Sequence, residues 1–242
     1  MDVRGAGALI TGGSRGLGVA IGRELARRGA RVVLVARGAE DLERVVAQIR
    51  GAGGEAHALV ADVGDKEAAY AIAGAAAALV GPVEVLVHNA STLGKVPLPL
   101  LLDTECEDLE AVLAVNLVGP FRLTKALAGS MVLRRRGLVL TVSSDAAVAA
   151  YPRWGAYGVS KAALDHLTRI WAAELEGTGV RFLSVDPGEM ATEMHAQAMP
   201  EADPATLADP QAVAVQIADL IEGAEGFPSG ERLEAARLAL TS

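Results

Sequence analysis

Apolar and polar positions repeat along this chain with two different periods. Short runs rich in Val, Leu, Ile and Ala have the length and composition of buried strands, and they cover residues 6–10, 31–36, 56–61, 83–88, 138–143 and 180–186. Stretches with apolar residues at helical spacing lie between them, at residues 16–28, 39–52, 66–80, 109–133 and 157–176. Apolar strands that alternate with helices predict an α/β fold, in which a doubly wound parallel sheet carries helices on both faces.

The chain shows no linker, repeat or shift in composition that would divide it. Its 242 residues suit one α/β domain with a substantial core, so we expect a single domain over residues 1–242. Because 51% of the residues are hydrophobic but only 3% are aromatic, aliphatic side chains must build most of that core.

Charge and cysteine usage exclude several classes of protein. The net charge of −8, without a basic stripe, argues against a nucleic-acid binder. Because Cys106 is the single cysteine, the chain cannot form an internal disulfide. Its position between two glutamates disfavours a thiolate nucleophile. No signal peptide precedes the first strand, and the apolar residues 68–83 are fewer than the roughly 20 that cross a bilayer. No cluster has metal-ligand spacing. We therefore expect a cytoplasmic protein that binds neither membrane nor metal.

A glycine-rich turn follows the first predicted strand and opens the first predicted helix. It reads Thr11-Gly12-Gly13-Ser14-Arg15-Gly16-Leu17-Gly18. Without side chains the backbone of such a turn can approach a pyrophosphate, whose charge is met by the amides at the helix start. The turn therefore predicts a dinucleotide-binding site.

Tyr157 and Lys161 are four residues apart, and Ser144 precedes Tyr157 by thirteen residues. A spacing of four places two side chains on one face of a helix. A lysine ammonium held there favours the phenolate, and we expect it to lower the tyrosine pKa from about 10 toward neutrality. Such a tyrosine can exchange a proton with a carbinol oxygen that the Ser144 hydroxyl holds in place.

Further motifs accompany these two sites in a fixed order. They are Asp62-Val63 after the third strand, His88-Asn89-Ala90 closing the fourth, Asn116 in Val115-Asn116-Leu117-Val118-Gly119, and Asp186-Pro187-Gly188 with Thr192 four residues on. Together the motifs resemble the classical short-chain dehydrogenase/reductase family over nearly the whole chain. The resemblance implies a Rossmann fold and a substrate lid at residues 189–209.

The resemblance also assigns roles to residues. The implied catalytic tetrad is Asn116, Ser144, Tyr157 and Lys161, with Ser144 preferred over Ser143 because of its spacing to Tyr157. The implied cofactor-binding residues are Thr11, Gly12, Ser14, Arg15, Gly16, Leu17, Gly18, Arg37, Asp62, Val63, Asn89, Ala90, Tyr157, Lys161, Pro187, Gly188 and Thr192.

Pro120 interrupts the long helical pattern just after Asn116. Proline cannot donate to the carbonyl four residues back, so it should free the Asn116 carbonyl. In the family this kink lets the carbonyl hold a water in a proton relay. The alternative is that Asn116 only caps or bends the helix.

The end of the second strand bears on cofactor choice. Selection of NAD needs a carboxylate about 20 residues beyond the glycines, to accept from the ribose 2′-hydroxyl. This chain has Ala36 followed by Arg37 there, and Arg15 should lie near the same ribose. Two guanidiniums without an opposing carboxylate suit a 2′-phosphate, which predicts NADP(H). The alternative is that both are solvated surface charges.

The sequence thus predicts an NADP(H)-dependent oxidoreductase that moves a hydride between nicotinamide and a carbonyl or secondary alcohol. We expect reduction of a small, mainly apolar ketone or ketoacyl substrate, because NADP pools are kept reduced. The candidates for the pocket walls are Met190, Met194, Met199, Tyr151, Pro152 and Trp154, and the alternative for each is an ordinary packing role. The alternatives are a catalytically silent NADP(H)-binding redox sensor and a structural subunit.

Two departures from the family pattern concern the fold rather than the chemistry. Ser91 stands where the family usually has glycine, and it should keep the turn while adding a hydroxyl. At the carboxyl end a strand can start within residues 227–233, whereas residues 234–238 look helical. This leaves both a homodimer and a homotetramer open, the dimer forming through the long helices at 109–133 and 157–176.

Overall fold

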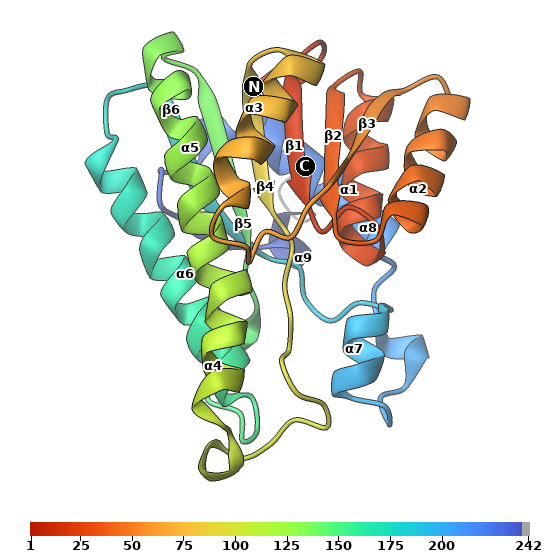
Figure 1. Cartoon of the computed structure of the whole chain (residues 1–242), viewed down its shortest axis with the longest axis vertical. Helices are drawn as coiled ribbons and strands as arrows, with labels where there is room; N and C mark the ends of the chain where they lie inside the picture. The colour runs from red at the N-terminus through yellow and green to blue at the C-terminus, as the bar shows by residue number, and fades with distance from the viewer. Residues whose placement is uncertain (239–242) are drawn as a thin grey trace.

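The structure is a computed structural model that describes residues 1–238. One sheet of parallel strands runs in the order β3-β2-β1-β4-β5-β6-β7. The strands are β1 (Gly7–Thr11), β2 (Arg31–Ala36), β3 (Glu55–Val60), β4 (Val83–His88), β5 (Gly137–Val142), β6 (Val180–Asp186) and β7 (Arg232–Glu234). The helices are α1 (Gly16–Arg27), α2 (Ala39–Gly51), α3 (Ala68–Val80), α4 (Cys106–Leu113), α5 (Gly119–Arg134), α6 (Gly155–Glu174), α7 (Glu193–Ala198), α8 (Pro210–Glu222) and α9 (Ala235–Leu238). The predicted fold class is confirmed (Figure 1).

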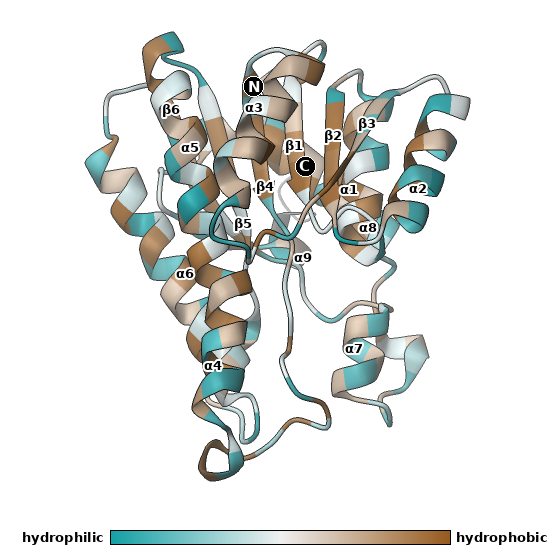
Figure 2. Cartoon of the chain, in the orientation of Figure 1, coloured by the Kyte–Doolittle hydropathy of each residue, from teal (hydrophilic) through white to brown (hydrophobic). Residues whose placement is uncertain are grey.

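The two faces of the sheet pack against different helices. In β1, Ala8 and Ile10 point into a core shared with α1, α2 and α8, whereas Leu9 points into a core shared with α3, α5 and α6. This alternation is the period of two that a strand imposes on its side chains. Figure 2 shows the central strands largely in hydrophobic colours and the outward side of α2 in hydrophilic ones. Burial on both faces explains why the strands are apolar throughout.

Three stretches differ from the sequence prediction. The single helix predicted at residues 109–133 begins earlier, at Cys106, and consists of α4, a π-helical turn at Ala114–Val118, and α5. Helices α7 and α8 were not predicted, although Asp209 accepts from the backbone N–H of Gln211 and Pro210 follows at the first helical position, a local start signal for α8. The short strand and helix anticipated at the carboxyl end are present as β7 and α9.

The carboxyl ends of the strands all open on one edge of the sheet. The glycine turn, the loop after β4, the turn after β5 and the segment after β6 meet there, and α7 projects beyond this edge at the bottom of Figure 1. The chain reverses its winding direction between β1 and β4, which are neighbours in the sheet. Ligands of doubly wound sheets bind at this switch point.

The α4–α5 segment, Cys106–Arg134, is long and apolar enough by length and composition to cross a bilayer. In this structure, however, Leu123, Leu127 and Met131 of α5 are buried in the core between the sheet and the helices α3 and α6. The segment is therefore a helix of the layered fold.

Candidate active site

A cavity of about 960 Å³ lies along the carboxyl edge of the sheet. It brings most of the predicted site residues together, namely Gly12, Ser14, Arg15, Gly16, Leu17, Arg37, Asp62, Val63, Asn89, Ala90, Ser144, Tyr157, Lys161, Pro187, Gly188 and Thr192. Thr11, Gly18 and Asn116 are not among the residues that line it.

Thr11 and Gly18 instead support the glycine turn, Thr11 by hydrogen bonds to the loop after β4 and Gly18 by close packing against Gly12. The Thr11 hydroxyl is buried and accepts from the backbone N–H groups of Asn89 and Ala90, both at 3.1 Å. A Cβ added to Gly18 would lie 2.1 Å from the carbonyl oxygen of Gly12 and 2.5 Å from Nδ2 of Asn89. Because atoms cannot approach this closely, Gly18 lets helix α1 sit directly on the turn.

The turn fits the diphosphate of a nicotinamide dinucleotide. Gly16 has a φ of 54°, in the left-handed region that favours glycine. Arg15 makes no side-chain cap to α1, and the first turn of that helix carries no acidic residue. The start of α1, at Gly16 and Leu17, lines the cavity, and the N-terminus of a helix favours an anion.

Both arginines predicted to bind a 2′-phosphate already face carboxylates. Arg15 Nη1 lies 2.6 Å from Oε2 of Glu193, and each of these side chains is 59% exposed. Arg37 Nη1 lies 4.0 Å from Oδ2 of Asp62. The expectation that neither arginine has a carboxylate beside it is therefore wrong. Arg15 pairs with Glu193 of α7, which is 178 residues away in the sequence, and Arg37 lies near Asp62. A phosphate at Arg15 has to compete with this exposed ion pair.

Helix α6 carries Tyr157 and Lys161 on the face that meets the end of β5. Both are buried, and the Lys161 ammonium lies 5.5 Å from the centroid of the Tyr157 ring. Its Nζ donates to the carbonyl oxygen of Val142 at 2.8 Å. The Ser144 hydroxyl accepts from the backbone N–H of Ala146 and donates to Oδ1 of Asp145 at 3.0 Å. These three residues therefore line one cavity, with the Ser144 hydroxyl and the Lys161 ammonium both beside Tyr157.

Burial controls the ionisation of both helix residues. It raises the pKa of Tyr157 to about 12, and the neighbouring hydroxyls of Ser144 and Ser91 act in the opposite direction. Burial also lowers the pKa of Lys161 to about 8, although the carboxylates of Asp165 and Asp186 act to raise it. The expectation that Lys161 brings the tyrosine pKa toward neutrality is wrong for this arrangement, because loss of solvation is the largest influence on the phenol. The phenol is thus protonated at neutral pH.

Asn116 lies in the π-helical turn and is buried. Its side chain accepts from the backbone N–H of Thr92 at 2.8 Å and donates to the Thr92 carbonyl and to the Ser160 hydroxyl. These bonds tie the helix to the loop after β4 and to α6. Pro120 follows, so the carbonyl of Asn116 receives no hydrogen bond from the residue four positions on.

Ser143 and Ser144 differ in where their hydroxyls point. Ser143 is 2% exposed and donates to Oδ2 of Asp165 at 2.7 Å, away from Tyr157. The Ser144 side chain is the one beside the Tyr157 phenol, as the spacing argument expects.

An apolar cluster walls the cavity beside Tyr157. It consists of Leu93, Leu98, Ala146 and Tyr157, with Trp154, Met194 and Ala198 packed against it. The Trp154 ring meets the Tyr157 ring edge to face, at 5.6 Å between centroids. The carboxylates that line the cavity include Glu189 and Asp145, and Asp145 accepts from the Tyr151 hydroxyl at 2.9 Å. Sequence analysis missed Asp145, although it directly follows Ser144.

Comparison with known proteins decides the family. The model of the short chain dehydrogenase family matches residues 6–203. The chain belongs to the short-chain dehydrogenase family of oxidoreductases. A short chain dehydrogenase of Pseudocercospora fijiensis is 40% identical to this chain over 198 residues, which are 81% of this chain and 63% of that protein. The chain thus spans less than two thirds of the length of this relative.

Solved structures that resemble this chain hold either NADP or NAD⁺. A metagenomic short-chain oxidoreductase in complex with NADP is 33% identical, with a TM-score of 0.81 over 96% of this chain and 99% of that one. An NAD⁺-bound xylitol dehydrogenase is 26% identical, with a TM-score of 0.86 over 97% of this chain and 98% of that one. The fold by itself therefore does not select between the two cofactors.

Proposed function

We propose that this protein is an NADP(H)-dependent reductase of ketones or ketoacyl compounds. The observation that carries the proposal is the convergence of Ser144, Tyr157 and Lys161 on one cavity that also holds the glycine turn. When bound, the nicotinamide supplies the hydride in reduction or accepts it in oxidation.

The chain's own residues supply the proton and hold the reacting oxygen. Tyr157 donates its phenolic proton to the substrate oxygen, and the Ser144 hydroxyl positions that oxygen. Burial raises the pKa of Tyr157 to about 12, so the phenol is protonated at neutral pH, which is the form that reduction of a carbonyl requires. Lys161 provides a positive charge beside the phenol and would hold the nicotinamide ribose. Asn116 fixes the helices that carry these groups.

NADP(H) rather than NAD(H) is supported by the charges around the end of β2. Ala36 stands where a carboxylate would bind the ribose 2′-hydroxyl, and Arg15 and Arg37 both line the cavity. Arginine binds phosphate through paired donors, which suits a 2′-phosphate.

The substrate end favours neutral carbonyl compounds. Its wall is apolar around Trp154 and Met194, and Asp145 and Glu189 place negative charge nearby. A substrate with its own carboxylate next to the carbonyl would be repelled. We propose that residues 189–209, which include Thr192 and α7, act as a lid over this end.

Apolar side chains exposed on the two long helices support a homo-oligomer. They are Phe121 and Leu133 on α5, and Val159 and Ile170 on α6. We propose a dimer in a cytoplasmic setting, formed through these helices. The redox-sensor and structural-subunit alternatives have no observation in their favour.

The test is oxidation of NADPH, followed by absorbance, against ketones, diketones, quinones and ketoacyl thioesters, with NADH in parallel. The proposal expects turnover of at least one neutral carbonyl and a clear preference for NADPH. Equal use of both cofactors would contradict the cofactor assignment, and preference for substrates carrying a carboxylate would contradict the assigned substrate class.

A further inference from the structure

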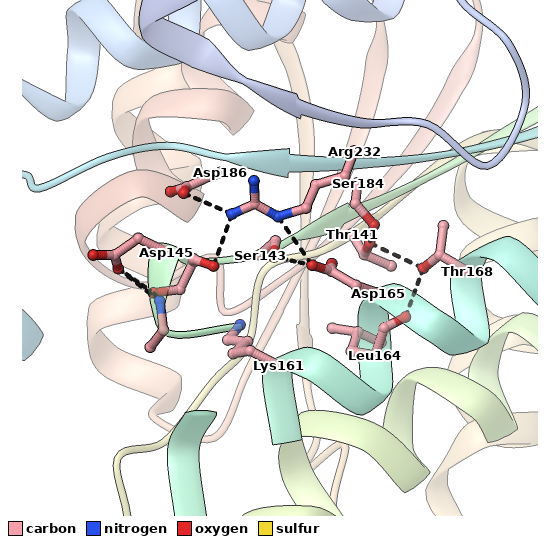
Figure 3. A network of polar contacts seen from close by, with 12 residues as sticks. Thr141, Ser143, Asp145, Lys161, Leu164, Asp165, Thr168, Ser184, Asp186 and Arg232 are labelled. Carbon is pink, nitrogen blue, oxygen red and sulfur yellow. Dashed lines mark hydrogen bonds and ion pairs between the residues drawn. The ribbon is translucent and has the colours of Figure 1, made fainter. Parts of the chain in front are cut away.

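Arg232 lies on β7, the last strand of the sheet, and its side chain contacts Ser144, Asp165 and Asp186. Its Nε donates to Oδ2 of Asp165 at 3.1 Å, and its Nη2 donates to Oδ2 of Asp186 at 2.8 Å. Nη2 also donates to the backbone carbonyl of Ser144 at 2.9 Å. Figure 3 shows the guanidinium lying between the two aspartates. One side chain therefore binds three separate parts of the chain.

Each of these three partners adjoins a residue of the proposed chemistry. Ser144 is itself the proposed hydroxyl, and the bond to its carbonyl fixes the turn after β5. Asp165 lies one helical turn after Lys161 on α6, and it also accepts from Ser143 at 2.7 Å. Asp186 ends β6 and leads into Pro187 and Gly188, which line the cavity. Arg232 thus joins the elements that must keep a fixed separation for the reaction to occur.

The same guanidinium balances the charge around Lys161. The Arg232 side chain is 21% exposed, and those of Asp165 and Asp186 are 5% and 11% exposed, so water screens this cluster weakly. Both aspartates act to raise the pKa of Lys161, and Asp186 also acts to raise that of Tyr157. The carboxylates that act on Lys161 are Asp165 on its own helix and Asp186 on β6, and Arg232 on β7 pairs with both. Tyr157 lies one helical turn before Lys161, and Asp145 after β5 acts on the Tyr157 phenol.

We propose that Arg232 is a positioning residue for the reaction, holding the Ser144 turn against α6 and the start of the segment after β6 while neutralising Asp165 and Asp186. The inference rests on the proposed function. It gives the carboxyl-terminal strand a role in catalysis although Arg232 does not line the cavity.

Arg181 provides a matched control for this role. It also ties the carboxyl-terminal segment to the sheet, with Nε donating to the carbonyl of Ala224 at 3.1 Å and Nη2 donating to that of Phe227. Among the residues that the structure describes, its side chain forms no hydrogen bond or ion pair with Ser144, Asp165 or Asp186. Loss of Arg181 should therefore remove structural support for the terminal segment without changing the charge behind Lys161.

The experiment compares Arg232→Met, Arg232→Lys and Arg181→Met in the full chain. The first readout is amide hydrogen exchange around Ala146 and Gly188, which needs no turnover. The second is the pH profile of kcat/KM, and the third is the NADPH dissociation constant. The double variant Asp165→Asn/Arg232→Met is included because removing Arg232 leaves a buried carboxylate without its cation, which can impair folding.

We expect Arg232→Met to exchange faster at both amides and to lose kcat by about 10- to 100-fold, as small displacements of reacting groups can do. NADPH affinity should change much less. The alkaline limb of the profile should move to higher pH, since the unbalanced aspartates raise the pKa of Lys161. Arg232→Lys should restore the position of this limb in part, and Arg181→Met should leave exchange at these amides and the profile unchanged.

Unchanged exchange and an unchanged pH profile in Arg232→Met would overturn the proposal, as would the same changes in Arg181→Met. If Arg232→Met does not fold, the double variant carries the exchange comparison, and wild-type exchange at both amides overturns the proposal. The pH profile of the double variant is not used, because Asp165→Asn removes a charge that acts to raise the pKa of Lys161 and so offsets the loss of Arg232. If the wild type turns over no carbonyl, the proposed function fails. The positioning of the Ser144 turn is then judged by exchange alone: faster exchange confined to the Arg232 variant supports it, and unchanged exchange overturns it.

Discussion

The ion pair between Arg15 and Glu193 should weaken the binding of NADPH but not of NADH. If Arg15 binds the 2′-phosphate, that phosphate has to displace or share the guanidinium now held by Glu193 at 2.6 Å. NADH has no 2′-phosphate and does not meet this competition. Replacing Glu193 with Gln removes the competing charge and keeps the shape of the side chain.

The size of the effect follows from exposure. Both side chains are 59% exposed, and exposed ion pairs of this kind are worth about 0.2–1 kcal/mol. Because 1.4 kcal/mol corresponds to about a factor of ten in affinity, Glu193→Gln should tighten NADPH binding by up to about fivefold. The gain should shrink as salt is added, since salt screens exposed charges.

Titration of cofactor fluorescence with NADPH and NADH, at low and high salt, measures both dissociation constants. Glu201→Gln is the control, because Glu201 is an exposed glutamate of the same segment, whereas Arg15 pairs with Glu193. A gain shared equally by NADH would show that the effect has nothing to do with the 2′-phosphate. Weaker NADPH binding would mean that Glu193 helps to hold the bound cofactor, and the competition argument would be wrong.

Three further predictions concern the glycine turn, Lys161 and the proposed dimer. Gly18→Ala should abolish cofactor binding and lower Tm, because the new Cβ would lie 2.1 Å from the Gly12 carbonyl oxygen; Gly74→Ala, in a helix with open space, should keep binding and raise Tm. As pH rises through about 8, Lys161 loses its charge and kcat/KM for reduction should fall, whereas in a slower Lys161→Arg variant the plateau should extend to higher pH. An identical alkaline limb in both proteins would contradict this assignment. Val159→Glu places a charge on the exposed apolar face of α6 and should give a monomer by light scattering, and an unchanged oligomer would place the interface elsewhere.

Local patterns in the sequence were sufficient for the layered architecture. Strand β2 was predicted with its observed bounds because burial on both faces makes the run apolar throughout. The glycine turn was predictable for a similar reason, since the backbone conformation at Gly16 and the tight contact at Gly18 leave little choice of residue. Sequence signals of this kind act within a few residues and survive without knowledge of the fold.

Contacts between distant segments could not be predicted in this way. Arg15 meets Glu193, 178 residues away, and Arg232 meets Asp165, 67 residues away. No pattern of neighbouring residues in the sequence predicts either pair. The pKa of Tyr157 was misjudged for a related reason, because burial is a property of the whole fold, whereas the spacing to Lys161 describes only one helix.

The central claim is that Tyr157 donates the proton in a reduction driven by NADPH. It is tested most directly by comparing wild type with Tyr157→Phe, measuring NADPH binding and carbonyl-dependent NADPH oxidation in the same preparations. The account predicts that the variant binds NADPH with nearly unchanged affinity and loses turnover by a factor on the order of 10² or more. Turnover close to that of the wild type would contradict the assignment of Tyr157 as the proton donor.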